Sequence, residues 1–319
     1  MFKKSEKLNI VKKNIKGLWN HEAYVKKYKN VKYTNKNPEL DHMLNRLKTV
    51  NKLLKINVRK GSNILELGFG AGQSAGLFLK EGYNYTGMDI SKSLVNFAKS
   101  KNKKFIKNKK ASFYVGSMDN KLKFKNEQFD AVIIIGALQY VMNLKKCMKE
   151  IKRVLKKRGI LILAQSNSFA IEQIIAPRKF IKFLMIVFFK EKFTYSYSTT
   201  LKSTITEIIG LKKLLKVNGN ERWLNSKLFI SGDYNPWNFK GKRHILGYDR
   251  IKQMLKNYNF NFITYSFGGV FFNNNNNNIL LNIIFYILNI LLNGLHKLKI
   301  FNFILNRIGS SNIFVLKKS

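Results

Sequence analysis

A carboxylate and several glycines stand close together in the segment ILELGFGAGQSAG, residues 64–76. Glu66 is followed by glycines at alternate positions, and residues 70–75 (GAGQSA) also satisfy the G-x-G-x-x-G/A pattern of dinucleotide-binding loops. Glycines directly after a buried strand let the backbone approach a ligand closely and turn sharply into a helix. Such a loop holds either a pyrophosphate, as in nicotinamide-dependent hydride transfer, or a cofactor without phosphates.

Glu66 favours the second alternative. A carboxylate at the end of the predicted strand faces the ligand and would repel a pyrophosphate, whereas a cationic ligand would gain a charge-assisted hydrogen bond. S-adenosylmethionine carries an ammonium group and a sulfonium and no phosphate. The third glycine of the strict dinucleotide pattern, counted from Gly68, falls on Gln73, which is a further departure. The residues therefore favour S-adenosylmethionine.

Asp89 ends the next predicted strand, in the stretch GMDIS. A carboxylate there can accept hydrogen bonds from both ribose hydroxyls, a feature that dinucleotide and adenosylmethionine sites share. The alternative is that Asp89 or Ser91 caps the following helix. The strand before Asp89 and the glycine loop upstream favour the ribose role.

The spacing of apolar residues predicts the scaffold for these side chains. Strands and helices alternate at a pitch typical of βαβ units, so we expect a parallel sheet with helices on both faces. The expected strands are 63–67, 83–89, 112–115, 129–136 and 160–164, and the expected helices are 38–54, 73–81, 92–101 and 144–157.

The chain divides into four parts in this interpretation. Residues 279–292 are apolar but shorter than the ~20 residues of a membrane span, so we expect a helix that caps the core, or else one that lies on a membrane surface. The predicted parts are a basic segment 1–37, a cofactor-binding core 38–166, a mainly helical substrate-cap insert 167–246, and the end of the core sheet 247–319 with an apolar helical insertion 273–310.

Composition narrows the function classes. The chain of 319 residues is 45% apolar, which excludes global disorder, and its only cysteine, Cys147, excludes a disulfide framework. No secretory signal is visible after Met1, so we expect a cytoplasmic protein, with peripheral contact at the inner face of a membrane as an option. The net charge of +42 is spread along the chain and comes with the high Asn and Ile usage that an AT-rich genome favours, so one interpretation is that part of it is compositional. As a functional charge it favours an anionic membrane or acidic substrate over nucleic acid.

Four segments between residues 44 and 165 resemble the class I S-adenosylmethionine-dependent methyltransferases, above all their ubiquinone and menaquinone methylase-like branch of small-molecule enzymes. The resemblance implies a Rossmann-like α/β fold with a seven-stranded sheet whose last strand is antiparallel. Residues 248–272 and 311–318 would then supply the final helix and the sixth and seventh strands. The four segments are ILELGFGAGQSA, YTGMDISKSLVNFAKS, YVGSMDNKLKFKNEQFDAVIIIGALQYV and KEIKRVLKKRGILIL.

The same resemblance implies which residues hold the cofactor. Ser117 stands where this family usually has an aspartate, and Asp119 is the candidate to replace it. The implied residues are Glu66, Gly68, Gly70 and Gly72 around the methionine part, Asp89 at the ribose, Ile90, Ser117 and Met118 at the adenine, and Gly136 near the methyl group.

Methyl transfer from a sulfonium needs a positioned acceptor, and a hydroxyl acceptor usually needs a base as well. His244 in the insert and Tyr140 after the fourth strand are the candidate bases, with Asp233 as an alternative. No metal site is predicted. The motifs of base-methylating enzymes, Asn/Asp-Pro-Pro-Tyr and a Pro-Cys loop, are absent, so we expect O-methylation of a small molecule, glycan or lipid-linked acceptor. Methylation or binding of RNA or another nucleic acid through the basic surface, and a Rossmann oxidoreductase, are the alternatives.

Overall fold

The structure is a computed structural model that describes most of the chain in one long stretch and several shorter segments. The described residues are 16, 20, 25, 38–167, 230–234, 239–243, 248–267, 279–298, 305–306 and 309–319.

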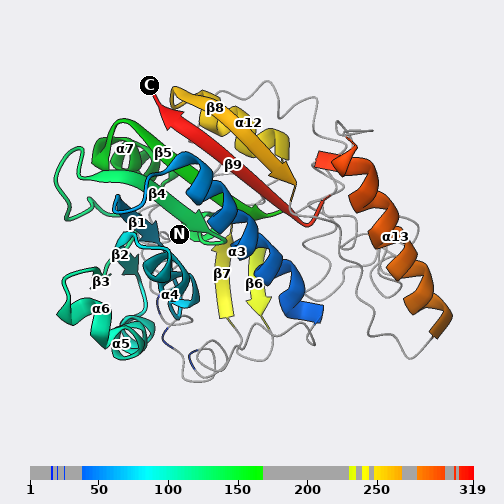
Figure 1. Cartoon of the computed structure of the whole chain (residues 1–319), viewed down its shortest axis with the longest axis horizontal. Coiled ribbons are helices and arrows are strands. Elements are labelled where there is room, and N and C mark those ends of the chain that lie inside the picture. Colours follow the sequence, from blue (N-terminus) through cyan, green and yellow to red (C-terminus); the bar gives the residue numbers. More distant parts are fainter. Residues whose placement is uncertain are drawn as a thin grey trace, which may run out of the picture.

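One seven-stranded sheet forms the centre of the molecule (Figure 1), with the order β3-β2-β1-β4-β5-β9-β8. The first five strands pair in parallel, whereas β9 runs antiparallel to both of its neighbours. This confirms the predicted fold class, including the antiparallel last strand. The strands are β1 Asn63–Leu67, β2 Asn84–Asp89, β3 Ala111–Val115, β4 Phe129–Ile135, β5 Leu155–Ser166, β8 Phe260–Phe267 and β9 Ser311–Lys318.

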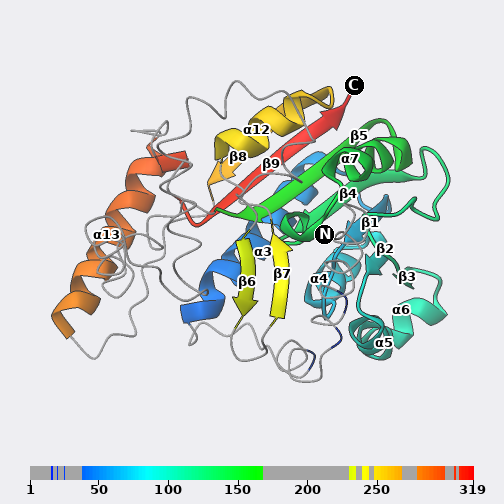
Figure 2. The same cartoon turned by 180° about the vertical axis from the view of Figure 1, so that it is seen from behind.

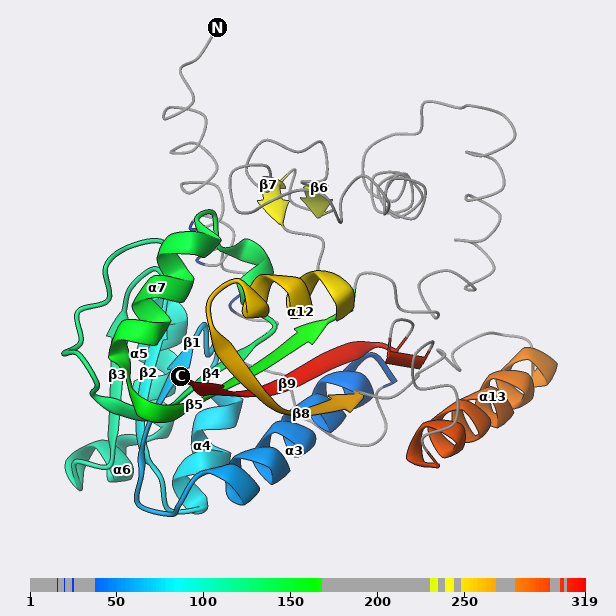
Figure 3. The ribbon, with the colours of Figure 1, turned by 90° about the horizontal axis from the view of Figure 1, so that it is seen from above.

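Helices cover both faces of the sheet, as the alternation of elements predicts. Figure 3 shows α3 (Pro38–Asn57) and α4 (Gln73–Lys80) on one side of the sheet and α7 (Leu144–Val154) and α12 (Tyr248–Lys256) on the other. The second pair lies in front of the sheet in Figure 2. The remaining short helices are α5 Lys92–Lys101, α6 Lys103–Lys107 and the 3-10 turn η1 Leu138–Tyr140.

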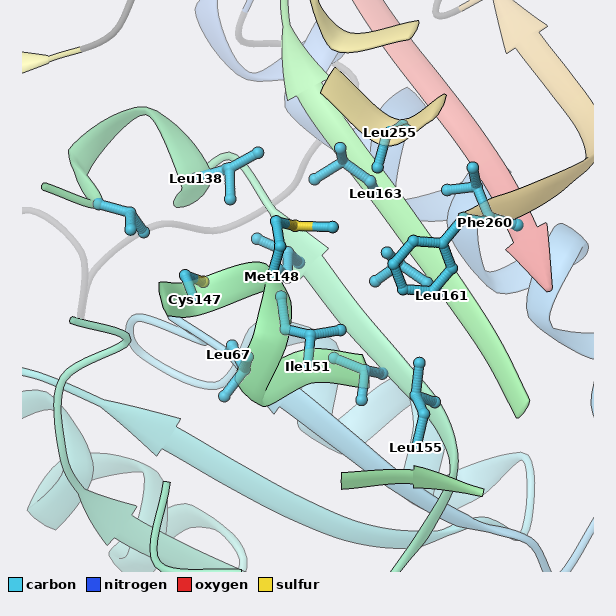
Figure 4. Close-up of a cluster of buried hydrophobic side chains, with 14 of the residues drawn as sticks. Leu67, Leu138, Cys147, Met148, Ile151, Leu155, Leu161, Leu163, Leu255 and Phe260 are labelled. Atoms are coloured by element: carbon cyan, nitrogen blue, oxygen red, sulfur yellow. The ribbon is translucent and has the colours of Figure 1, made fainter. Parts of the chain in front are cut away.

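Apolar side chains of α7 pack onto the central strands (Figure 4). Met148 and Ile151 face Leu161 and Leu163 of β5, and all four are buried. Met148 and Ile151 belong to the i, i+3, i+4 stripe of an amphipathic helix, which is why this segment folds onto the sheet. Cys147 lies in the same cluster, and burial raises the pKa of its thiol far above the ordinary value. This thiol is therefore a packing group and not a nucleophile.

The predicted helix 144–157 is three residues too long. It ends at Val154, and the next residues begin β5, where Leu155 pairs with Phe129 before a register shift. Arg158 has a positive φ of 60°, which marks the irregularity. The sequence LKKR has good helix formers, but pairing with β4 and full burial of Leu155 override that propensity.

The insert is only partly described. Its described residues form a two-stranded antiparallel sheet of β6 (Ile230–Tyr234) and β7 (Phe239–Arg243), and β7 contacts η1. The sequence predicts a mainly helical insert and gives no sign of these two strands. Each strand contains a glycine, which hides the alternation of side chains that would indicate a strand. Apart from Asn167, the other residues of 167–246 lie outside the described part of the chain.

The predicted apolar helix is α13 (Ile279–Lys297), which extends five residues beyond the expected end. It lies at the periphery of the molecule in Figure 1. Among the described residues, no helix combines the length and the apolar character that crossing a bilayer requires.

Candidate functional site

A cavity of about 660 Å³ lies at the carboxyl ends of the first five strands. The strand order reverses between β1 and β4, and such switch points are where open α/β sheets bind ligands. All but one of the predicted cofactor residues line this cavity. They are Glu66, Gly68, Gly70, Asp89, Ile90, Ser117, Met118 and Gly136.

The exception is Gly72, which lies at the N-cap of α4. A Cβ atom on Gly72 would lie 3.0 Å from Cβ of Ala98, so this glycine serves close packing between α4 and α5. A Cβ on Gly68 would meet Cβ of Ala137 at 2.4 Å, whereas one on Gly70 would meet no atom within 4 Å. All three glycines have positive φ angles, of 76°, 61° and 78° in chain order. Gly70 is thus the one that leaves open space toward the cavity.

Glu66 is buried at the end of β1. The hydroxyl of Ser74 lies 2.7 and 2.6 Å from its two carboxylate oxygens, and the hydroxyl of Tyr85 donates to Oε2 at 2.7 Å. Burial raises the pKa of Glu66 to about 7, and the two hydrogen bonds only partly offset this. Since a buried charge gains most from an opposite charge, a cation in the cavity would favour the ionised form.

Asp89 is bound from two sides at the end of β2. The backbone N–H of Gly70 donates to Oδ2 at 2.8 Å and that of Ser91 to Oδ1 at 2.9 Å. Ser91 is the N-cap of α5, because its hydroxyl accepts from the N–H of Leu94. Of the two predicted caps for this helix, Ser91 is therefore confirmed and Asp89 is wrong. Burial raises the pKa of Asp89 to about 6.

The turn after β3 is fastened to the loop after η1. Oδ1 of Asp119 accepts the backbone N–H groups of Met142 and Asn143 at 2.7 and 2.8 Å. The hydroxyl of Ser117 accepts from the N–H of Asp119 at 3.2 Å. Asp119 also lines the cavity, but one of its oxygens already holds the loop, which limits its role as the replacement for the usual aspartate.

Arg46 of α3 is a cavity residue that the sequence interpretation missed. Its guanidinium is buried and donates from Nε to Ser311 Oγ at 3.0 Å and from Nη2 to Ser166 Oγ at 2.9 Å. A Cβ on Gly136 would lie 3.2 Å from Nη1, so this glycine makes room for the arginine. The available signal was a charge on the apolar face of the helix, beside Met43, Leu47 and Val50.

The N-terminal segment reaches the glycine loop. Val25 is buried against Ala71 and Leu94, and the hydroxyl of Ser91 lies 3.3 Å from Oδ1 of Asn20. Lys16 lines the cavity. These three described residues of the predicted segment 1–37 therefore border the site.

Of the candidate bases, Tyr140 lies in η1 and lines the cavity. His244 lies outside the described residues, and Asp233 lies on β6, where the structure describes the backbone alone. His296 contacts Asn306 Oδ1 at 3.1 Å, away from the cavity lining. In the described segments no group of three His, Cys, Asp or Glu side chains is placed to hold a metal ion.

Two buried amides, outside the cavity lining, lie on the paired strands β5 and β9. Gln165 is fully buried beside Ser166, and neither its Nε2 nor its Oε1 has a hydrogen-bond partner. Asn312 is its partner across the β5–β9 pair, and Nδ2 of Asn312 also has no partner. The hydroxyl of Tyr265 donates to Oδ1 of Asn312 at 2.8 Å. Because unpartnered buried amides cost stability, they mark a place where a polar ligand group or a water would bind.

Residues 65–163 match the sequence model of a family described as a methyltransferase domain. An uncharacterised protein of Methanocaldococcus jannaschii is 34% identical over 125 residues, which are 39% of this chain and 45% of that protein. A demethylmenaquinone methyltransferase of Tropheryma whipplei is 27% identical over 126 residues, 40% of this chain and 47% of that protein. The chain thus spans about half the length of the curated relatives it matches.

A chain of a solved structure has a similar fold, with a TM-score of 0.51 and 13% identity. That structure is a complex that contains the Haloferax volcanii Trm112 methyltransferase activator. The alignment covers 95% of this chain and 97% of that one. At this identity the likeness concerns the fold alone.

Proposed function

Because the chain carries a class I S-adenosylmethionine-dependent methyltransferase domain, we propose that the protein transfers a methyl group from this cofactor to a small-molecule, glycan or lipid-linked acceptor. The observation that carries the proposal is the placement of two buried carboxylates, Glu66 and Asp89, in one cavity at the ends of neighbouring strands. A cofactor that is cationic at one end and has ribose hydroxyls further along matches this pair.

The cavity residues fit the cofactor group by group. Glu66 would accept a hydrogen bond from the cofactor's ammonium group, and Asp89 would accept from its ribose hydroxyls. The open space at Gly70 would let the cofactor approach the backbone of the loop. The guanidinium of Arg46, which lines the same cavity, would pair with its carboxylate. Ile90 and Met118 would provide apolar contacts for its adenine.

When bound, the cofactor supplies an electrophilic methyl group together with its own leaving group. The protein therefore has to hold the acceptor in line and exclude water. Tyr140 lines the cavity, as Gly136 does, and it belongs to η1, the element that β7 of the insert contacts, so it would act as a base for a hydroxyl acceptor or orient it. His244 of the insert is the second candidate for this role.

Two observations support the acceptor class. One relative is a demethylmenaquinone methyltransferase, which supports a quinone-like molecule as the small-molecule acceptor. The net charge of +42 supports an acceptor that is acidic or is presented at an anionic membrane, and the proposal includes such peripheral contact.

A transfer experiment tests the proposal. The protein is incubated with methyl-labelled S-adenosylmethionine and an extract of the cells that make it, which is then separated into organic-soluble, small aqueous and nucleic-acid fractions. Label in the organic-soluble or small aqueous fraction is expected. Label in the nucleic-acid fraction would establish the alternative that the basic charge also permits, and no transfer into any fraction would refute methyltransferase activity.

A further inference from the structure

One side of α13 is apolar and open to solvent. At about 100° per residue, its exposed apolar positions fall within an arc of about 160° on the helix. This outer face consists of Ile283, Ile284, Tyr286, Ile287, Ile290, Leu291 and, directly after the helix, Leu298, which are between 41% and 71% exposed.

The opposite side of α13 is attached to the rest of the protein. Leu288, Leu292 and His296 lie on that side and are partly buried. His296 contacts Asn306 Oδ1, which lies near the start of β9 in the chain, and the hydroxyl oxygen of Tyr265 lies 3.2 Å from the carbonyl oxygen of Asn306. The outer face therefore lies on the side of the helix away from these contacts, and Figures 1 and 3 show the helix apart from the sheet.

Two kinds of partner would cover such a face, a second copy of this chain or an anionic membrane, and charge favours the membrane. A second copy of this chain carries the same +42, and residues 279–297 contain no Asp or Glu to offset that repulsion. An anionic membrane attracts a protein of this charge, by about 1 kcal/mol for each basic residue near its surface. No described helix is apolar and long enough to cross a bilayer, but a helix can lie in the interface plane with its apolar face inserted.

We propose that the outer face of α13 is a docking surface for an anionic membrane. The helix has 19 residues, so it would lie along about 28 Å of the interface, with its outer face inserted among the acyl chains. This deepens the proposed peripheral location and rests on it, but it is independent of methyl transfer. A docked enzyme would meet a lipid-linked acceptor in the plane of the membrane.

Vesicle flotation tests the proposal. The full chain is mixed with vesicles of phosphatidylcholine and phosphatidylglycerol or of phosphatidylcholine alone, and the floated fraction is measured. The double variant Ile287→Glu/Ile290→Glu is compared with Ile56→Glu, because Ile56 is an equally apolar residue of α3 that is 67% exposed. We expect binding to the anionic vesicles, a loss of about tenfold in the double variant, and unchanged binding in the control.

Three results would overturn the proposal. They are no flotation of the wild type, equal flotation of the double variant and Ile56→Glu, and a wild-type dimer in sedimentation velocity that the double variant abolishes. Thermal denaturation shows that each variant is folded. Calorimetric titration with S-adenosylmethionine separates the two claims, because a protein that floats without binding the cofactor would contradict the proposed function and leave the docking surface intact.

Discussion

The backbone N–H of Gly70 donates a 2.8 Å hydrogen bond to Oδ2 of Asp89. The bond joins the glycine loop after β1 to the end of β2, so the parts of the cavity proposed for the methionine and the ribose of the cofactor are held together. The loop is therefore positioned before any ligand arrives, which lowers the cost of ordering it on binding.

Gly70 and Gly68 form a matched pair for testing what the glycines do. Alanine at Gly70 is strained by the positive φ, at about 1 kcal/mol, but its Cβ enters open cavity space. We expect Gly70→Ala to stay folded and to lose affinity for S-adenosylmethionine. Gly68→Ala must also displace Ala137 and is expected to unfold at a clearly lower temperature. Thermal denaturation and calorimetry measure both effects, and wild-type affinity in Gly70→Ala would contradict this role.

The raised pKa of Glu66 predicts a pH dependence of binding. A cationic ligand binds the ionised carboxylate, so a group with a pKa of about 7 must release a proton on binding below that pH. Affinity for S-adenosylmethionine should therefore rise from about pH 5.5 to about pH 7.5, with proton release seen by calorimetry in two buffers. Asp89, with a pKa of about 6, should contribute to the rise in affinity in the lower part of this pH range. Glu66→Gln should reduce the release, and proton uptake would refute the role of Glu66.

The same shift predicts how the stability of the ligand-free protein changes. The pKa of Glu66 is higher in the folded protein than its ordinary value of 4.5, so the folded state holds the proton more tightly. The contribution to stability is full below pH 4.5 and is lost as the pH rises through about 7. Denaturant titrations at several pH values measure the free energy of unfolding. This free energy should fall less steeply with rising pH in Glu66→Gln than in the wild type, and an equal fall in both proteins would contradict the shift.

Arg46 should contribute to cofactor binding through its charge and its geometry. Arg46→Gln removes the cation from the cavity, and we expect about tenfold to a hundredfold weaker binding of S-adenosylmethionine, since charged hydrogen bonds are worth roughly 1.5–3 kcal/mol. Arg46→Lys should recover part of this, because it keeps the charge but not the fixed donors to Ser166 and Ser311. Lys48→Gln, an exposed change on the same helix, is the control. Equal affinities in all three variants would contradict the assignment.

Gln165 offers a test of the unpartnered amides. Gln165→Met removes two buried polar atoms that have no partner at nearly constant volume, so the free energy of unfolding should rise by about 1 kcal/mol. If the amide serves the acceptor, methyl transfer should fall while affinity for the cofactor stays unchanged. A less stable variant with full transfer activity would show that the amide is structural.

Local features of the site were readable from the sequence, whereas features that depend on distant partners were not. Glu66 and Asp89 each end a buried strand, so their place at the carboxyl edge follows from the chain itself. Arg46 stands on the apolar face of its helix, which hints at burial, but its partner Ser166 lies 120 residues later in the chain and could not be predicted from the local sequence. The early start of β5 depends in the same way on Phe129 of a neighbouring strand. The seven strands of one sheet and the antiparallel last strand came from the resemblance, because non-local pairing leaves no periodic signal.

The central claim is that the cavity holds S-adenosylmethionine through Asp89, and calorimetric titration of wild type and Asp89→Ala tests it most directly. Asp130→Ala is the matched control, since that carboxylate lies at the opposite end of the sheet and binds Lys156. We predict saturable binding by the wild type and the control, and about tenfold to a hundredfold weaker binding by Asp89→Ala. No binding by the wild type, or equal binding by Asp89→Ala and the control, would contradict the account.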